Sequence, residues 1–279
     1  MSEKHKIYVI CGPTATGKTA RAIALAKKID GEIISADSRQ VYRGMDIGTA
    51  KITTDEMSGI PHHMIDIVDP NDEFSVHDFQ RLGRIAIDDI LSRGKIPIIA
   101  GGTGYYIDAL VFDKQMPEVA PNPKLRAELN KLTTDELFAR IVPLDPDRAQ
   151  TIDKHNHVRL VRALEIIDTL GYVPENTTGD SLFDIQWEIL DLPDDKLRYR
   201  IHERNVARIE NGLIEEVQEL NNNGVSWERL EKFGLEYRYV SQFINGKIES
   251  KEKLIEILDA KTWQFAKRQR LWFRKYADK

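Results

Sequence analysis

Residues 12–19 read Gly-Pro-Thr-Ala-Thr-Gly-Lys-Thr and match the phosphate-binding pattern G-x-x-x-x-G-K-[ST]. The glycines of this pattern let successive backbone N–H groups point at a polyphosphate, and the following helix adds its positive dipole end. The Lys18 ammonium supplies a further positive charge, and the Thr19 hydroxyl suits a magnesium ion that bridges the phosphates. The loop therefore predicts that the chain binds a diphosphate or a triphosphate.

A phosphate loop alone does not specify a reaction, because kinases, NTPases and rarer transferases all use one. An NTPase normally has a second, magnesium-linked acid at the end of an apolar strand. The apolar run at residues 96–100 leads instead into Gly-Gly-Thr-Gly, which argues against ATP hydrolysis. Asp37 follows another apolar run and is a candidate general base, or else a turn-capping or magnesium-linked carboxylate. Thr103 is a candidate binding hydroxyl or part of a simple turn.

These candidate residues need a scaffold of alternating strands and helices. Apolar runs predict strands at residues 7–10, 31–37, 63–68, 96–100 and 185–190, and helical patterning includes residues 19–28 and 85–93. The alternation favours an α/β fold with a P-loop NTPase-like parallel sheet, covered by helices on both faces. Ligands of such sheets bind at the carboxyl ends of the strands, so we expect the phosphate loop, Asp37 and Thr103 to converge.

The composition of the chain shifts near residue 116, where three prolines occur within residues 116–123. Helical patterns then cover 124–132, 134–141 and 145–170. We therefore expect an all-helical insertion domain at residues 116–175, within a core formed by residues 1–115 plus 176–279. We expect the helices that end this core at 194–222, 250–258 and 260–276.

Composition and charge limit the partners of the chain. It has 279 residues, 41% of them hydrophobic, with a formal net charge of -5 and one cysteine, Cys11. We find no apolar run of the ~20 residues that a membrane crossing needs and no signal peptide, and we therefore expect no membrane partner and a cytoplasmic location. Basic clusters at residues 198–208 and 261–279, and the pair Arg159 and Arg162, fit either a nucleic-acid surface or solvated helix faces.

Seven segments in a fixed order carry a resemblance to a known family. They are Gly12 to Thr19, Ser35-Ala36-Asp37-Ser38-Arg39-Gln40-Val41-Tyr42, Gly44-Met45-Asp46-Ile47-Gly48-Thr49-Ala50-Lys51, Pro61-His62-His63, Gly101-Gly102-Thr103-Gly104-Tyr105-Tyr106, Arg159-Leu160-Val161-Arg162-Ala163-Leu164-Glu165 and Ala266-Lys267-Arg268-Gln269. Together they resemble the bacterial type of tRNA dimethylallyltransferase, also described as tRNA isopentenyltransferase, of the IPP transferase family. The resemblance covers residues 7 to about 276.

The resemblance implies a prenyl transfer from dimethylallyl diphosphate to N6 of the adenosine immediately 3′ of the tRNA anticodon, with release of diphosphate. It implies that Asp37 is the general base and that Thr103 hydrogen-bonds near the same amine. It also implies a Mg²⁺ ion held through Thr19, and Arg204, or alternatively Arg200, on the diphosphate. The donor-binding residues are then Gly12, Pro13, Thr14, Ala15, Thr16, Gly17, Lys18, Thr19 and Arg204. We expect a monomer.

The resemblance also assigns contacts to the anticodon stem-loop of tRNA. These contacts are Asp37, Ser38, Arg39, Gln40 and Thr103 in the core, and Arg126, Val158, Arg159, Leu160, Val161 and Arg162 in the helical insertion. The adenosine must leave its stack to reach the donor, so base flipping is expected. Residues 234–238 depart from the family pattern, so RNA contacts there stay open.

Other functions remain open from the residues. An adenylate isopentenyltransferase uses the same donor with free AMP, ADP or ATP. A small-molecule kinase would use the loop for ATP, and a non-catalytic RNA-binding module would leave the loop, Asp37 and Thr103 unexplained. The helical insertion favours tRNA, because a mononucleotide needs no such clamp.

Overall fold

The computed structural model describes residues 4–114, 116–117, 119–175 and 178–277. The chain forms two compact units, one made of Met1–Asp113 with Asp180–Lys279 and the other of Lys114–Gly179. The helical unit therefore begins two residues before the expected range 116–175 and ends four residues after it. The reason is that the chain leaves and re-enters the first unit through two paired strands, β5 (Phe112–Lys114) and β6 (Thr178–Ser181).

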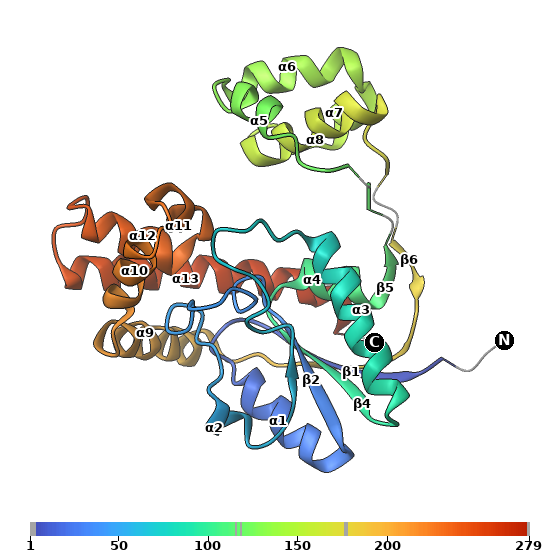
Figure 1. The fold of residues 1–279 in the computed structure, drawn as a ribbon, viewed down its shortest axis with the longest axis vertical. Coiled ribbons are helices and arrows are strands. Elements are labelled where there is room, and N and C mark those ends of the chain that lie inside the picture. The colour runs from blue at the N-terminus through green and yellow to red at the C-terminus, as the bar shows by residue number, and fades with distance from the viewer. Residues whose placement is uncertain (1–3, 115, 118, 176–177, 278–279) are drawn as a thin grey trace. The chain divides into compact units, whose positions relative to one another are not determined.

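The first unit is built on a five-stranded parallel sheet (Figure 1). Its strands are β1 (Lys6–Cys11), β2 (Gly31–Ala36), β3 (His62–His63), β4 (Ile96–Gly101) and β7 (Asp184–Ile189), in the order β3-β2-β4-β1-β7. The expected α/β fold with a parallel sheet is thereby confirmed. The expected strand at residues 63–68 is wrong, because Met64 and Asp66 adopt positive φ and turn the chain after His63.

Both faces of the sheet are buried, which explains the continuous apolar runs of its strands. Ala22 and Leu25 of α1 (Lys18–Ile29) pack with Ile10 of β1 on one face. The other face is covered by α3 (Val76–Ser92) and α4 (Gly104–Val111), whose Phe79 and Ile107 pack with the odd-numbered apolar residues of β1. Helix α3 begins before the expected residue 85, because Ser75 and Asp78 form a capping box.

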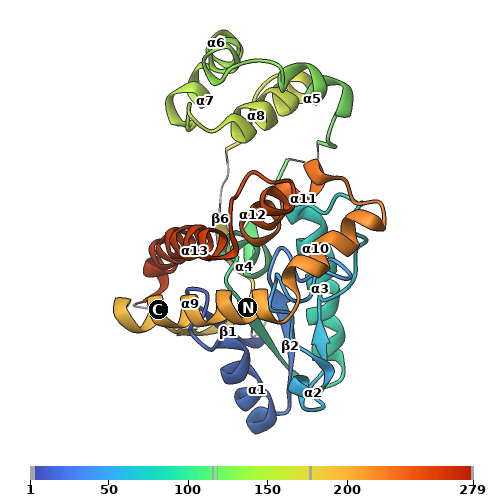
Figure 2. The same cartoon turned by 90° about the vertical axis from the view of Figure 1, so that its left-hand side faces the viewer.

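Five helices and a short 3₁₀ turn complete the first unit (orange to red in Figures 1 and 2). They are α9 (Asp194–Glu210), α10 (Leu213–Asn222), α11 (Trp227–Phe233), α12 (Leu235–Ile244), α13 (Lys251–Phe273) and η1 (Arg274–Tyr276). The single helix expected at 194–222 is wrong, because Gly212 adopts φ 99° and separates α9 from α10. The two helices expected at 250–258 and 260–276 are one helix, α13.

Within its described residues, the second unit has four helices around its own apolar core. They are α5 (Pro123–Leu129), α6 (Thr134–Leu144), α7 (Pro146–Thr151) and α8 (His157–Leu170). The single helix expected at 145–170 is wrong, because Ile152 is extended and Asn156 caps a new helix by accepting from the Arg159 N–H. Among the described helices, none combines the length and apolar character that a membrane crossing needs.

Candidate functional site

A cavity of about 280 Å³ lies in the first unit, where the carboxyl ends of β1, β2 and β4 meet. It is lined by residues from six of the seven sequence segments quoted above and by further residues of α9 and α13, among them Thr14, Ala15, Gly17, Lys18, Thr19, Asp37, Gln40, Thr49, Ala50, His62, Gly102, Arg204 and Gln269. The phosphate loop and Asp37 therefore converge at the cavity as expected. Among the described residues, Gly101 and Gly102 of the turn after β4 line the cavity and Thr103 does not; the Thr103 hydroxyl accepts instead from the Ser38 N–H at 3.3 Å.

The phosphate loop is shaped by unusual backbone angles between β1 and α1. Gly12 adopts φ 141°, and a Cβ atom there would lie 2.1 Å from the Leu190 carbonyl oxygen. Ala15 and Gly17 also have positive φ, at 63° and 92°. No side chain caps the start of α1, so its first N–H groups are available to an anion. This geometry suits a polyphosphate.

Two half-buried cations face this loop. The Lys18 ammonium donates to the Pro13 carbonyl oxygen at 2.6 Å, and burial, followed by repulsion from Arg204, lowers the pKa of Lys18 to about 8. Burial also lowers the pKa of Arg204, with Arg208 as the next cause. Within the described residues, Nε of Arg204 is buried and has no hydrogen-bond partner. Two positive charges that lie side by side and are partly removed from water are costly unless an anion joins them, so the site favours a polyanion.

Arg200 and Arg204 both lie near the loop, so the structure does not separate these two candidates by proximity alone. Arg204 lines the cavity. A guanidinium nitrogen of Arg200 would lie 3.9 Å from a Cβ atom placed on Gly17.

Asp37 follows β2 and forms a local turn with its own backbone. Its Oδ1 accepts from the N–H of Arg39 at 2.8 Å and from the N–H of Gln40 at 3.4 Å. Within the described part of the chain, no hydrogen bond reaches Oδ2. The neighbouring Ser38 N–H donates to the Thr103 hydroxyl at 3.3 Å, which ties Asp37 to the turn after β4. Oδ1 is therefore part of a structural turn, whereas Oδ2 accepts no hydrogen bond from the described residues, and Asp37 lines the cavity.

Two cavity residues carried no role in the sequence prediction. Gln269 accepts from the Thr14 N–H at 2.8 Å and donates to the Gly102 carbonyl at 2.9 Å. His62 shares a hydrogen bond between Nδ1 and the Ile60 carbonyl at 2.8 Å, and burial lowers its pKa. Both belong to segments of the family resemblance, which was the available signal.

The loop at residues 44–51 forms one wall of the cavity and is held from behind. The Glu216 carboxylate accepts from the N–H groups of Asp46, Ile47 and Gly48, and from the Tyr237 hydroxyl at 2.8 Å. Tyr237 is 2% exposed. Whether residues 234–238 contact RNA was left open above. For Tyr237 the structure shows a different role, because its buried hydroxyl supports the cavity wall through Glu216.

Gln40 is similarly committed to internal contacts. Its side-chain oxygen accepts from the Ser35 hydroxyl at 2.8 Å, and its nitrogen donates to the carbonyls of Thr49 and Ala50, each at 3.3 Å. Its side chain therefore holds the cavity wall, and its position beside Asp37 is fixed. Ser38 and Arg39 are half-buried next to it.

The residues expected to contact tRNA in the second unit divide into three groups. Val158 and Arg159 are exposed at the start of α8. Leu160 and Val161 are 0% and 5% exposed and belong to the core of the unit, so the prediction that their side chains contact RNA is corrected. The apolar face of α8 turns both of them inward.

Arg126 and Arg162 share a buried partner in the second unit. Glu165 accepts from Arg126 at 2.7 and 3.0 Å and from Arg162 at 3.4 Å, and its side chain has no exposed area. Arg162 also donates to the Val119 carbonyl at 2.7 Å. Both arginine side chains keep about a third of their area exposed, at 32% and 33%. They therefore stabilise this unit and still present positive charge at its surface.

Three other basic residues of the sequence clusters form ion pairs within the fold. Arg208 pairs with Glu236 at 2.6 Å, and Lys275 pairs with Asp108 at 2.7 Å. Arg270 pairs with Asp194 at 2.7 Å. These members of the clusters at 198–208 and 261–279 are ion-paired, which fits the structural interpretation of those clusters better than a free polyanion surface.

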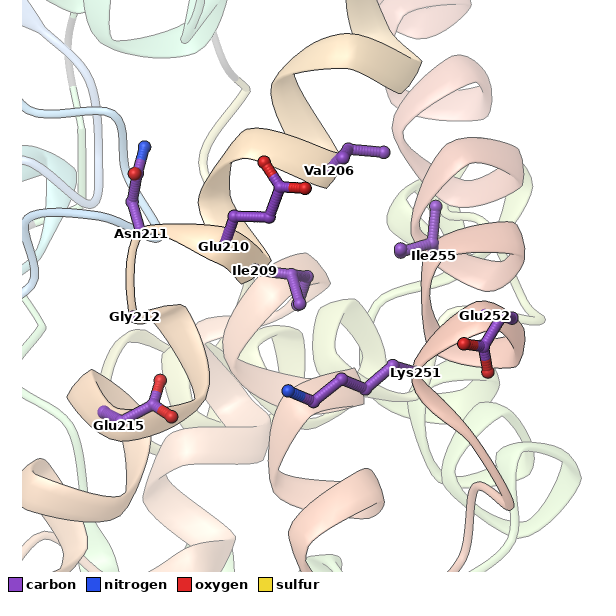
Figure 3. A pocket seen from close by; sticks show the side chains of 9 residues that line it. All are labelled: Val206, Ile209, Glu210, Asn211, Gly212, Glu215, Lys251, Glu252 and Ile255. Carbon is purple, nitrogen blue, oxygen red and sulfur yellow. The ribbon is translucent and has the colours of Figure 1, made fainter.

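A second hollow, of about 590 Å³, lies where α9 turns into α10 beside the start of α13 (Figure 3). Its charged side chains are Lys251 and the carboxylates Glu210, Glu215 and Glu252. Three acids against one base make a poor site for a polyphosphate, so the cavity at the strand ends is the candidate site.

The cavity also offers oxygen ligands for a divalent cation. No group of three or more His, Cys, Asp or Glu side chains suited to a metal is found among the described residues. Mg²⁺ is commonly held by one or two protein oxygens together with substrate phosphates, and Thr19 and Asp37 both line the cavity with oxygen donors. The residues present fit such an ion.

Comparison with known proteins gives consistent matches. A sequence model described as IPP transferase matches residues 40–276, and one described as isopentenyl transferase matches residues 5–68. The chain is 45% identical over 281 residues to a tRNA dimethylallyltransferase of an Exiguobacterium strain, covering 99% of this chain and 89% of that protein. It is 44% identical over 277 residues to tRNA dimethylallyltransferase 2 of Trichlorobacter lovleyi, covering 98% and 89%.

Solved structures resemble the chain over a similar extent. The full-length tRNA isopentenylpyrophosphate transferase of Bacillus halodurans matches with a TM-score of 0.74 and 38% identity, covering 99% of this chain and 88% of that chain. A eukaryotic dimethylallyltransferase acting on tRNA matches with a TM-score of 0.79 and 31% identity, covering 96% and 70%.

Proposed function

This chain belongs to the IPP transferase family, and from that premise we propose that its cavity holds dimethylallyl diphosphate beside an adenosine of tRNA. The chain is a prenyltransferase that acts on tRNA. The acceptor atom we propose is N6 of the adenosine immediately 3′ of the anticodon. The reaction transfers the five-carbon group to this atom and releases diphosphate.

The diphosphate of the donor lies at the phosphate loop in this proposal. The free N–H groups at the start of α1, the Lys18 ammonium and the Arg204 guanidinium surround the same cavity. Negative charge grows on the diphosphate as the bond to carbon breaks, so fixed positive groups stabilise the transition state more than the ground state. The two half-buried cations thereby gain their counter-ion from the substrate.

Asp37 acts as the general base on the acceptor side. The N6 lone pair attacks C1 of the dimethylallyl group, the bond from C1 to the diphosphate oxygen breaks, and the proton leaving N6 passes to Oδ2 of Asp37. Its Oδ1 stays bonded to the N–H groups of Arg39 and Gln40, which keeps the carboxylate in place. Thr103 lies beside it through Ser38 and is proposed to bind near the same amine.

A Mg²⁺ ion fits the site as the cofactor, held through the Thr19 hydroxyl and the phosphate oxygens of the donor. When bound, it neutralises charge on the departing diphosphate. The chain's own residues supply the remaining contacts, because the loop N–H groups and Lys18 act on the same oxygens.

The helical unit Lys114–Gly179 is proposed to grip the anticodon stem-loop. Arg126, Val158, Arg159 and Arg162 keep exposed area there and fit contacts to phosphates and to the shape of the RNA. We propose that the reaction takes place in the cytoplasm and that the chain acts as a monomer.

The observation that carries the proposal is the cavity that brings the phosphate loop, Asp37 and two half-buried cations together at the strand ends. The test incubates the protein and Mg²⁺ with labelled dimethylallyl diphosphate and either unmodified tRNA or AMP. Label is expected in the tRNA at the adenosine next to the anticodon. Label in AMP alone would support an adenylate isopentenyltransferase, and phosphate transfer from ATP to a metabolite would support a kinase.

A further inference from the structure

Gln269 of α13 connects two loops at the base of the cavity. Its side-chain oxygen accepts from the Thr14 N–H in the phosphate loop at 2.8 Å, and its nitrogen donates to the Gly102 carbonyl at 2.9 Å. The residue is 6% exposed. Both polar ends of a buried carboxamide are therefore used, one on each loop.

The bridge lies where two neighbouring strands stop pairing. β1 and β4 run side by side, and their last partners are Cys11 and Gly101. Beyond this pair the chain continues into the phosphate loop on one side and into the turn at residues 101–104 on the other. The Gln269 carboxamide takes the place of the next backbone hydrogen bonds and fixes the separation of the two loops.

The chemistry of the two loops requires an amide at this position. The Thr14 N–H can only donate and the Gly102 carbonyl can only accept, so the bridging group must accept at one atom and donate at the other. A Cβ atom on Gly102 would lie 2.3 Å from Nε2 of Gln269, so glycine is needed there for the contact. A charged carboxylate keeps only the first of the two hydrogen bonds, and a methionine keeps neither.

The two loops hold the two halves of the reaction. Thr14 belongs to the loop proposed to bind the donor diphosphate. Gly102 precedes Thr103, whose hydroxyl accepts from the Ser38 N–H beside Asp37. A change in the Gln269 bridge therefore alters the separation between the donor loop and the acceptor side of the cavity.

We propose that Gln269 is a positioning residue for prenyl transfer, which sets the spacing between the donor loop and the side of the cavity formed by Asp37 and Thr103. This inference rests on the proposed function. It assigns no contact between Gln269 and the reacting atoms, and its effect therefore falls on the catalytic step more than on the binding of either substrate.

The test uses two substitutions at this site and one control on the same helix. Gln269→Met is expected to lower kcat about 10- to 100-fold at saturating substrates, because misplacement of reacting groups by about 1 Å costs this much. The KM for each substrate is expected to stay within about threefold of wild type, because a lower kcat with an unchanged KM is the pattern of a change that acts on the transition state alone. Gln264→Glu, at an exposed position of α13, is expected to leave kcat unchanged.

The pH profile of Gln269→Glu provides a readout that general destabilisation does not move. A protonated glutamic acid both accepts and donates, so it restores the two hydrogen bonds. The ratio of variant to wild-type kcat is expected to rise at least about threefold from about pH 8 to about pH 5.5, because burial raises a carboxyl pKa toward this range. Because this variant regains both bonds in acid, it tests the proposal even if Gln269→Met fails to fold.

The outcomes separate the inference from the proposed function. Wild-type kcat in Gln269→Met, or a Gln269→Glu ratio that stays constant with pH, would overturn the role of Gln269. A loss that appears only in the KM for dimethylallyl diphosphate would also overturn it, since charge or lost binding would then explain the effect. Absence of tRNA prenylation by the wild-type chain would instead overturn the proposed function.

Discussion

Replacement of Asp37 by asparagine tests the proposed base without removing the turn that holds it. The asparagine side chain keeps an oxygen that accepts from the N–H groups of Arg39 and Gln40, as Oδ1 of Asp37 does at 2.8 and 3.4 Å. What it loses is Oδ2 as a proton acceptor. We expect the rate of prenyl transfer to fall about 10²–10⁴-fold, the usual contribution of general-base catalysis. This corresponds to about 2.7–5.4 kcal/mol of transition-state stabilisation.

Comparison with Asp37→Ala separates catalysis from local structure. Alanine removes the proton acceptor and both turn hydrogen bonds, and a hydrogen bond to a charged group contributes about 1.5–3 kcal/mol. The free energy of unfolding should therefore fall in Asp37→Ala and stay near the wild-type value in Asp37→Asn. The tRNA dissociation constant of Asp37→Asn should stay within about threefold of wild type, because Ser38 and Arg39 remain in place.

The assay is single-turnover transfer from saturating labelled dimethylallyl diphosphate, so that product release does not limit the rate. Filter binding of tRNA and urea unfolding accompany it. An Asp37→Asn rate above about one tenth of wild type would refute the assignment of Asp37 as the base. A large loss of tRNA affinity in the same variant would show instead that the carboxylate binds substrate.

Three further predictions follow from the charges of the fold. Burial lowers the pKa of Lys18 to about 8, so the free enzyme loses this positive charge as the pH rises through 8. The kcat/KM for dimethylallyl diphosphate should therefore fall about tenfold per pH unit above pH 8. The Lys18→Met variant should lack this fall at high pH. The hydrogen bond from Arg93 is the main cause that lowers the pKa of Glu32 from 4.5 to about 2; burial opposes it by raising the pKa, and the hydrogen bond with His63 lowers it further. This contribution to stability is therefore present above pH 4.5 and lost as the pH falls toward 2, so Glu32→Gln should lower the free energy of unfolding by about 2–3 kcal/mol at neutral pH, with a smaller difference in acid, as measured by urea titration. Arg159→Ala should weaken tRNA binding and reduce the slope of log affinity against log salt by about one, measured by filter binding at several salt concentrations.

The Arg159→Ala prediction has a matched control variant, and each of the other two has an outcome that would contradict it. Arg140→Ala changes an exposed arginine on another helix of the same unit and should leave the salt slope nearer the wild-type value than Arg159→Ala does. A flat profile of kcat/KM above pH 8 in the wild-type enzyme would contradict the role of Lys18. A Glu32→Gln difference that persists unchanged into acid would show that the carboxylate charge is not the source of the stability.

The strand ends of the cavity could be predicted from local sequence because each depends on a short pattern. The phosphate loop, the acid after β2 and the Gly-Gly-Thr-Gly turn after β4 all lie where apolar runs stop, and a parallel sheet brings such ends together. The helical period of α8 also indicates that Leu160 and Val161 point into the core of their unit. Their predicted RNA contacts came from the family resemblance alone, which does not take this period into account.

Other features depend on contacts between distant residues and carry no local signal. Gln269 meets Thr14 across 255 positions of sequence, and Tyr237 supports residues 46–48 through Glu216. Nothing in the residues adjacent to Gln269 indicates which backbone groups its carboxamide will reach. Such bridges become visible only when the packing of α13 against the sheet is known.

The paired strands β5 and β6 have a consequence for the ancestry and the engineering of the chain. Because the two crossings of the helical unit are hydrogen-bonded neighbours, its removal would leave two chain ends that a short turn can join with little loop-closure entropy. The core would then retain every residue that lines the cavity. An insertion with adjacent ends can thus be gained, lost or exchanged as a module, and substrate choice can change without rebuilding the chemistry.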